Sequence, residues 1–175
     1  FHGAPGTGKS TYIRYLIHNQ NKRVIFMPVG IARNLESPEF ISLLIENPNT
    51  ILVIEDAEDM LVSREINHNS GISTLLNLTD GLLGESLGIQ VICTFNTKLE
   101  NIDRALVRKG RLLQMYEFQP LSLEKTNSLL QELYGKEYSA KRPMAIAEIF
   151  NAEETGFEHN IVKKQRIGFV GNSVN

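Results

Sequence analysis

The sequence predicts an α/β fold in which helices cover an open parallel sheet. Apolar runs of strand length alternate with segments of helical periodicity, the pattern of parallel strands joined by helices. Glycine or polar residues follow these runs, and ligands of open parallel sheets bind beside the carboxyl ends of the strands. We therefore expect residues 1–120 to form this core and residues 121–175 to form a small helical lid with a tail.

Apolar runs are expected to form the strands. The run TILVI at residues 50–54 is apolar almost throughout, as in a central strand that is covered on both faces. Cys93 lies in a similar run, so we expect it to fill the core rather than to react. Only Phe1 and His2 precede the first glycine, so we expect an excerpt whose first strand, and anything upstream, is missing or nearly so. The four runs lie at residues 23–29, 50–54, 89–96 and 112–118.

Helix signals lie between and after the strand candidates. Ser37 is a favourable N-cap and Pro38 suits the first helical position. The apolar face of that helix should contain Phe40, Ile41, Leu44 and Ile45. Other helices are expected at residues 11–17, 74–83, 103–109, 123–133 and 144–150. The strand signals stop at Ser122, so the lid is expected to be all-helical.

Composition narrows the possible functions. The chain has 175 residues, of which 42% are hydrophobic and 22% charged, as is usual for a soluble globular protein. The formal net charge of −2 gives no electrostatic case for a nucleic-acid partner. No apolar run approaches the roughly 18 residues of a membrane span, so membrane contact is expected only through a missing upstream region. A lone cysteine fits a reducing compartment, and a cytoplasmic location is expected.

The segment at residues 3–10 fits the phosphate-binding pattern G-x-x-x-x-G-K-[ST] at every fixed position. Its glycines allow positive φ angles and close approach of the backbone to a polyphosphate. Lys9 brings a positive charge to the β- and γ-phosphates, and the Ser10 hydroxyl can bind Mg²⁺. The helix that follows would point its first N–H groups at the phosphates. The predicted nucleotide-binding residues are Gly3, Ala4, Pro5, Gly6, Thr7, Gly8, Lys9, Ser10 and Thr11.

Polar residues at the ends of two strand candidates are suited to hydrolysis. One carboxylate of the pair Glu55 and Asp56 could serve the Mg²⁺ shell while the other polarises the attacking water. Neighbours on a strand point to opposite faces, so the pair could divide these roles. Asn96 follows the next strand and could orient the water or touch the γ-phosphate. A solvated acidic turn is the alternative, because Glu58 and Asp59 are also acidic.

Arg108 and Arg111 lie three residues apart beside a glycine. Guanidinium groups presented to a phosphoryl-transfer site stabilise the charge that develops in the transition state. A solvated basic turn is the alternative for this segment.

Together these features resemble the AAA family of ATPases over roughly residues 1–150. Residues 3–10 match the Walker A motif, residues 51–56 the Walker B strand, Asn96 sensor 1, and residues 102–111 the second region of homology. The resemblance implies ATP and Mg²⁺ as cofactors and ATP hydrolysis. It also implies that Arg108 and Arg111 reach the site of a neighbouring subunit in a ring, usually a hexamer. The implied work is remodelling or translocation of a protein substrate.

The order Glu55-Asp56 replaces the usual Asp-Glu of the family. It looks like the subgroup that contains the mitochondrial inner-membrane chaperone that assembles respiratory complex III. By position in that motif, the resemblance implies that Glu55 is the carboxylate on the Mg²⁺ side and that Asp56 activates water.

Other features depart from the family pattern. No aromatic-apolar-glycine pore loop stands between residues 29 and 49, where Phe40 fits the core better. Arg142 is the candidate for the lid arginine called sensor 2. Two other functions stay open, a nucleotide-dependent switch or scaffold with little turnover and an ATPase that acts on nucleic acid.

Overall fold

The structure is a computed structural model that describes residues 1–28, 30, 35, 37–58, 82–98, 100, 112–152 and 161–163. The chain divides into two compact units, Phe1–Gln119 and Pro120–Asn175. Within the residues described, no helix is both long enough and apolar enough to cross a bilayer.

A parallel sheet forms the centre of the larger unit and confirms the predicted α/β fold. Strands β2, β3 and β4 pair in that order, and β1 pairs with β5. The two sets are joined at Phe95, which accepts a bond from Gly3 N at 3.2 Å and donates one to Phe1 O at 3.0 Å. The hydrogen-bonded order is therefore β2-β3-β4-β1-β5. The bounds are β1 His2–Gly3, β2 Arg23–Met27, β3 Thr50–Ile54, β4 Gln90–Cys93 and β5 Glu117–Phe118.

Most strands are shorter than the sequence predicts. The run at residues 112–118 gives only the two residues of β5, although residues 112–116 are described. The first strand, expected to be missing or nearly so, consists of the two residues of β1, which bond to neighbours on both sides. Because β1 lies inside the sheet, the loop that follows it is anchored on two sides.

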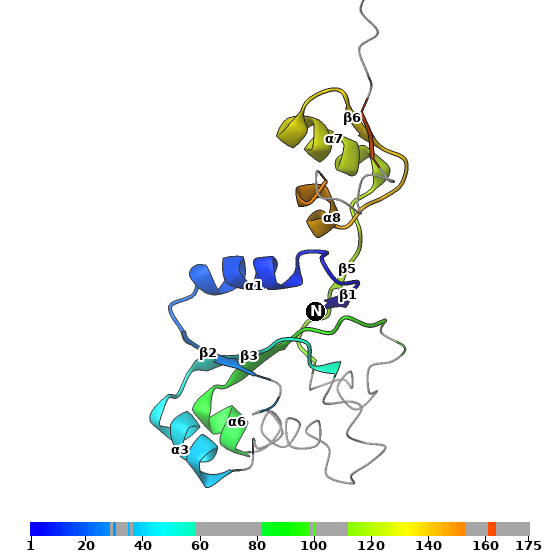
Figure 1. Cartoon of the computed structure of the whole chain (residues 1–175). Helices are drawn as coiled ribbons and strands as arrows, with labels where there is room; N and C mark the ends of the chain where they lie inside the picture. The colour runs from blue at the N-terminus through cyan, green and yellow to red at the C-terminus, as the bar shows by residue number, and fades with distance from the viewer. Residues whose placement is uncertain are drawn as a thin grey trace, which may run out of the picture. The chain divides into compact units, whose positions relative to one another are not determined.

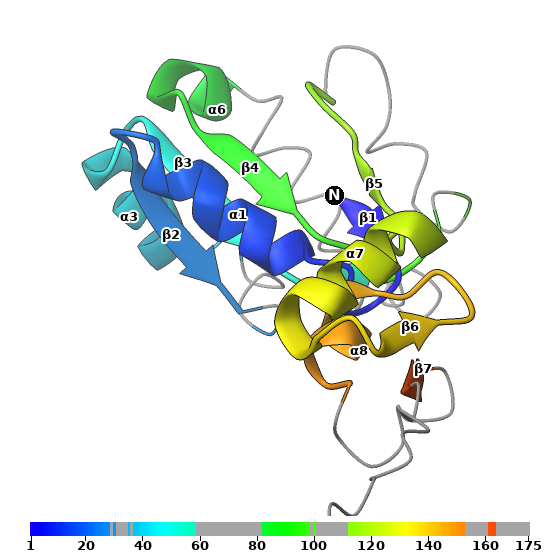
Figure 2. The same ribbon diagram turned by 90° about the horizontal axis from the view of Figure 1, so that it is seen from above.

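Helices cover both faces of the sheet, as Figures 1 and 2 show. Helix α1 (Lys9–His18) lies on one face, and α3 (Pro38–Glu46) and α6 (Leu82–Leu87) lie on the other. Strand β3 is buried throughout and alternates between two cores. Ile51 and Val53 pack with Ile13 of α1, while the alternate residues Leu52 and Ile54 join the opposite core. That opposite core contains Met27, Leu35, Phe40, Leu44, Leu52, Ile54, Ala57 and Phe95.

Helix α3 begins where its sequence predicts. Ser37 caps it, and its Oγ accepts a bond from Phe40 N at 3.2 Å. Phe40 and Leu44 are buried and Ile41 is partly buried, but the prediction for Ile45 is wrong, since 54% of its surface is exposed. A nine-residue helix on a sheet buries a narrow stripe, and Ile45 lies outside it.

The smaller unit combines helices with a strand pair, so the prediction that it is all-helical is wrong. Strands β6 and β7 pair antiparallel, from Tyr138 opposite Lys163 to Ala140 opposite Ile161. The core of this unit includes Leu130, Met144 and Ile149, all fully buried. The bounds are α7 Leu123–Tyr134, β6 Tyr138–Ala140, α8 Ile146–Phe150 and β7 Ile161–Lys163.

Two predicted helices lie wholly or largely outside the described residues. The helix expected at residues 103–109 lies wholly outside them. The helix expected at residues 74–83 lies outside except for the first two residues of α6.

Candidate active site

The segments that carry the predicted chemistry follow three neighbouring strands of the sheet. The phosphate-binding loop follows β1, Glu55 and Asp56 follow β3, and Asn96 lies just past β4. Because the strands are parallel, their carboxyl ends meet at the same edge. In the order β3-β4-β1 these segments are therefore neighbours.

Lys9 organises the phosphate-binding loop from inside. Its Nζ donates to Gly3 O and to Ala4 O, both at 2.9 Å, and Thr7 Oγ1 donates to Ala4 O at 2.7 Å. Lys9 and Thr7 are buried, with 6% and 3% of their surface exposed. The other predicted loop residues are partly buried (Gly3, Gly8 and Ser10) or exposed (Ala4, Pro5, Gly6 and Thr11). The loop thus forms a compact turn around an ammonium group.

The amino end of α1 is suited to an anion. Gly8 is the N-cap, in a left-handed conformation with φ 101°, and no side chain caps the helix. The first turn carries no acidic residue, and the first N–H with a helical bond is that of Tyr12, which donates to Gly8 O at 2.9 Å. The N–H groups of Lys9, Ser10 and Thr11 are therefore the ones that a phosphate would accept from.

The charge on Lys9 is subject to opposing influences. Burial lowers the pKa of its ammonium group below the ordinary 10.5, because the charged form is poorly solvated. The carboxylates of Asp56 and Glu58 act against this and favour the charged form. These acidic groups are thus close enough to influence the phosphate-binding lysine.

Gly3 has a structural reason for lacking a side chain. Its φ is 138°, and a Cβ added there would lie 2.1 Å from Phe118 O of β5. The phosphate-binding pattern predicts a glycine here for close approach of the backbone to phosphate. In the structure, the close neighbour is the backbone of the adjacent strand.

A tight turn presents Glu55 and Asp56. Strand β3 ends at Ile54, and Asp56 has a left-handed conformation with φ 53°. Thr94 fixes this turn: its Oγ1 accepts from Asp56 N at 2.9 Å, and its carbonyl oxygen accepts from Ala57 N at 2.8 Å. The expectation that strand alternation separates the two acids is wrong, because both lie beyond the strand. The turn, rather than strand alternation, sets the directions of the side chains of Glu55 and Asp56.

Asn96 is bound to two acidic side chains. Its Nδ2 donates to Asp56 Oδ1 at 2.6 Å and to Glu58 Oε1 at 3.0 Å. Its backbone N–H donates to Glu58 Oε2 at 3.2 Å. The structure thus brings together Asp56 and Asn96, two of the predicted catalytic residues, and adds Glu58.

The residues proposed to bind Mg²⁺ fit that ion by their chemistry. Ser10 offers a hydroxyl oxygen and Glu55 a carboxylate, and both are partly exposed. No three His, Cys, Asp or Glu residues of the described segments form a metal site by themselves. In nucleotide sites one or two protein ligands usually suffice, because phosphate oxygens supply others.

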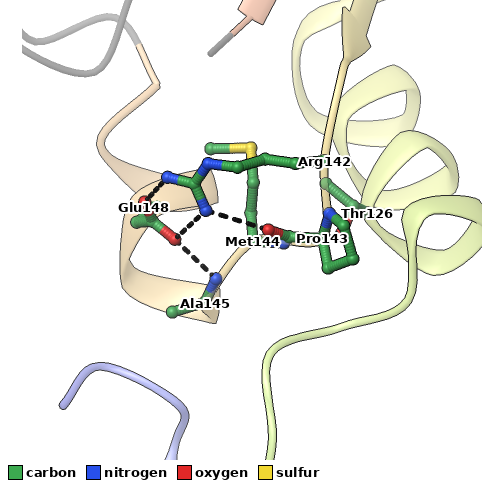
Figure 3. Close-up of polar contacts among 6 residues, drawn as sticks. All are labelled: Thr126, Arg142, Pro143, Met144, Ala145 and Glu148. Atoms are coloured by element: carbon green, nitrogen blue, oxygen red, sulfur yellow. Dashed lines mark hydrogen bonds and ion pairs between the residues drawn. The ribbon is translucent and has the colours of Figure 1, made fainter. Parts of the chain in front are cut away.

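The predicted arginines have different outcomes. Arg108 and Arg111 lie outside the described residues. Arg142, the sensor 2 candidate, binds Glu148 within the smaller unit at 2.5 Å and donates to Pro143 O at 2.9 Å, as Figure 3 shows. Glu148 also accepts from Ala145 N at 2.8 Å at the start of α8. Arg142 therefore has a structural task within its own unit.

Sequence reasoning missed the roles of Thr94 and Glu58. Thr94 is 1% exposed and lies two residues before Asn96, in what reads as an ordinary strand end. In the sequence, Glu58 is one of several acidic residues in a turn. The available signal was position, since each lies two residues from a predicted catalytic residue.

Comparisons with known proteins agree with this geometry. Residues 1–120 match the family model described as "ATPase family associated with various cellular activities (AAA)". The "Probable mitochondrial chaperone BCS1-A" of Dictyostelium discoideum is 26% identical over 99% of this chain and 42% of its own length. The "Probable 26S proteasome regulatory subunit 4" of Caenorhabditis elegans is 27% identical over 87% of this chain and 37% of its own. An AAA-ATPase of Arabidopsis thaliana is 30% identical over 70% of this chain and 30% of its own. The chain thus spans less than half the length of each of these relatives.

Proposed function

Because this chain belongs to the AAA family of ATPases, and is therefore an ATP-hydrolysing P-loop enzyme, we propose that it is the Mg²⁺-dependent motor module of a ring. The ring is proposed to be a hexamer of identical subunits, and its hydrolysis cycle to remodel or translocate a protein. The observation that carries this proposal is the bonded pair of Asp56 and Asn96 at the sheet edge where the phosphate-binding loop begins.

In the proposed mechanism residues 3–11 hold ATP. The uncapped N–H groups at the start of α1 bind phosphate oxygens, and the ammonium group of Lys9 neutralises the β- and γ-phosphates. Ser10 and Glu55 would hold the Mg²⁺ ion, which would supply charge neutralisation at the phosphates when bound.

Hydrolysis itself is assigned to groups of two subunits. Asp56 accepts a proton from the attacking water, and Asn96 orients that water. Arg108 and Arg111 of an adjacent copy stabilise the charge that develops on the phosphoryl group. The roles of Arg108 and Arg111 are supported by the family match, which covers residues 1–120 and so includes both arginines.

A protein substrate is supported by the relatives' names and by charge. One relative is named as a chaperone and another as a proteasome subunit. The formal net charge of −2 does not favour nucleic acid. We place the protein in the cytoplasm on the basis of its lone cysteine, and subcellular fractionation tests that placement.

Site-directed variants of the full-length protein test the catalytic assignment. Asp56→Asn and Arg108→Ala are each expected to reduce ATP turnover by about 10³-fold or more while ATP binding is retained. Normal hydrolysis by both would refute the catalytic assignment. If the unchanged protein binds ATP tightly but hydrolyses it no faster than these variants, it is instead a switch or scaffold. Stimulation by DNA or RNA with a steep salt dependence would indicate a nucleic-acid substrate.

Mixing variants tests whether the site is shared between subunits. Lys9→Ala and Arg108→Ala damage opposite sides of a boundary, so about a quarter of boundaries in a random equimolar ring would be intact, and activity should return. Lys9→Ala mixed with Asp56→Asn is the control, because both changes damage the same side. Recovery in neither mixture would refute the shared site.

A further inference from the structure

Glu58 holds Asn96 in a way that a general acidic turn does not explain. Its two carboxylate oxygens accept from two different N–H groups of Asn96, the backbone N–H at 3.2 Å and the side-chain Nδ2 at 3.0 Å. A carboxylate that accepts two bonds from one residue fixes both the position of that residue's backbone and the rotation of its side chain.

The same contacts set which way round the amide of Asn96 lies. A carboxylate can only accept, and the amide nitrogen has two hydrogens to donate. One is donated to Asp56 Oδ1 and the other to Glu58 Oε1. The carbonyl oxygen is therefore the polar atom of this side chain that is left for a water or another donor.

We propose that Glu58 is a positioning residue for hydrolysis, which holds the amide of Asn96 with its nitrogen toward Asp56 and its carbonyl oxygen toward the attacking water. This inference rests on the proposed roles of Asp56 and Asn96. It also distinguishes between the two roles that the sequence left open for Asn96. With both amide hydrogens bonded to carboxylates, Asn96 accepts from the water and does not donate to the γ-phosphate.

Charge makes the arrangement sensitive to an isosteric change. A glutamine at position 58 has an oxygen at only one of the two terminal positions and an NH₂ group, which only donates, at the other, so it cannot accept the two bonds from Asn96 on two separate oxygens. If its amide nitrogen faces Asn96 Nδ2, two donors meet. If Asn96 rotates to relieve this, its carbonyl oxygen meets the carboxylate of Asp56. Glu58→Gln should therefore impair the site despite its nearly unchanged shape.

The test is steady-state ATP hydrolysis and ATP affinity of the full-length protein. Glu58→Gln is expected to lower kcat by roughly 10- to 100-fold, since small misplacements of catalytic groups have effects of this size. Its ATP affinity should stay within about twofold of the unchanged protein. Glu46→Gln, at the exposed end of α3, is the matched control and should leave both values unchanged.

A double variant shows whether Glu58 acts through Asn96. If it does, Glu58→Gln combined with Asn96→Ala should be no slower than Asn96→Ala alone. If the double variant is slower than Asn96→Ala by the same factor that Glu58→Gln alone loses, the proposal is overturned. A normal kcat in Glu58→Gln would also overturn it, as would a loss of both kcat and ATP affinity in that variant. Normal turnover in Asn96→Ala refutes the proposed role of Asn96. If Glu58→Gln is slow in that case, Glu58 does not act through Asn96 and the positioning role also fails.

Discussion

Alanine at Gly3 is a sharp test of how the site is built into the sheet. The added Cβ would lie 2.1 Å from Phe118 O and 3.0 Å from Phe118 C. These are backbone atoms of β5, which cannot move aside as the end of a long side chain can. Either β1 or β5 must shift by more than 1 Å to restore ordinary contact at 3.4 Å.

The expected cost can be assembled from the contacts around β1. Overpacking of this kind costs about 1–3 kcal/mol, and a residue with a side chain adds about 1–2 kcal/mol at an unfavourable positive φ. The shift also strains the bond from His2 N to Tyr116 O, 3.0 Å long, which contributes about 1 kcal/mol. The total is about 3–6 kcal/mol, a large part of a typical domain stability of about 5–15 kcal/mol.

Denaturant unfolding of the full-length protein, followed by circular dichroism and by ATP binding, measures this cost. Two other glycines provide graded controls. The Cβ of Gly88→Ala would clash with a side-chain atom, Asn49 Oδ1 at 2.6 Å, and φ there is 63°, so about 1–2 kcal/mol is expected. A Cβ on Gly30 meets nothing within 4 Å among the residues that the structure describes, so Gly30→Ala should be nearly neutral. If Gly3→Ala unfolds no earlier than Gly30→Ala, the proposed packing of β1 against β5 is wrong.

Three further predictions concern single side chains. Thr94→Val leaves Asp56 N without its acceptor and should cost about 1–3 kcal/mol and slow ATP turnover, whereas Thr94→Ser should preserve both; denaturation and steady-state assays compare the two. The bond from Arg142 lowers the pKa of Glu148 below its ordinary 4.5, so this contact stabilises the smaller unit above that pH and is lost as pH falls through the lowered value. Melting curves from about pH 7 to about pH 3 should show that Glu148→Gln is less stable at neutral pH and less sensitive to acid. Cys93 is partly buried against the core, and desolvation raises the pKa of its thiol to about 12, so iodoacetamide should label it in the folded protein only slowly even at about pH 8, and rapid labelling would contradict this.

The sequence predicted elements whose signals are local. Ser37 and Pro38 mark the start of α3 because capping depends on neighbours along the chain. The run at residues 50–54 identifies β3 because both faces of a central strand are apolar. Strands β6 and β7 could not be predicted in this way. Each has three residues, too few to show the alternation of a strand, and the two are far apart in the sequence.

The candidate site was predictable in its parts but not in its connections. The residues Lys9, Asp56 and Asn96 follow from motifs and from strand ends. The bonds of Asn96 to Asp56 and Glu58 span 40 and 38 positions. They depend on the register of β3 with β4 and on the left-handed turn at Asp56. Neither feature can be predicted from a short segment of the sequence.

The two carbonyl bonds of Lys9 affect how nucleotide enters and leaves. The ammonium group donates to Gly3 O and Ala4 O and keeps a third hydrogen, so a phosphate that accepts more than this one replaces an oxygen of the protein. Net affinity is then a difference between two sets of contacts, and it is smaller than the attraction of the phosphate alone. When product departs, these two oxygens still accept from the ammonium group, so the empty site does not hold an unpaired buried charge.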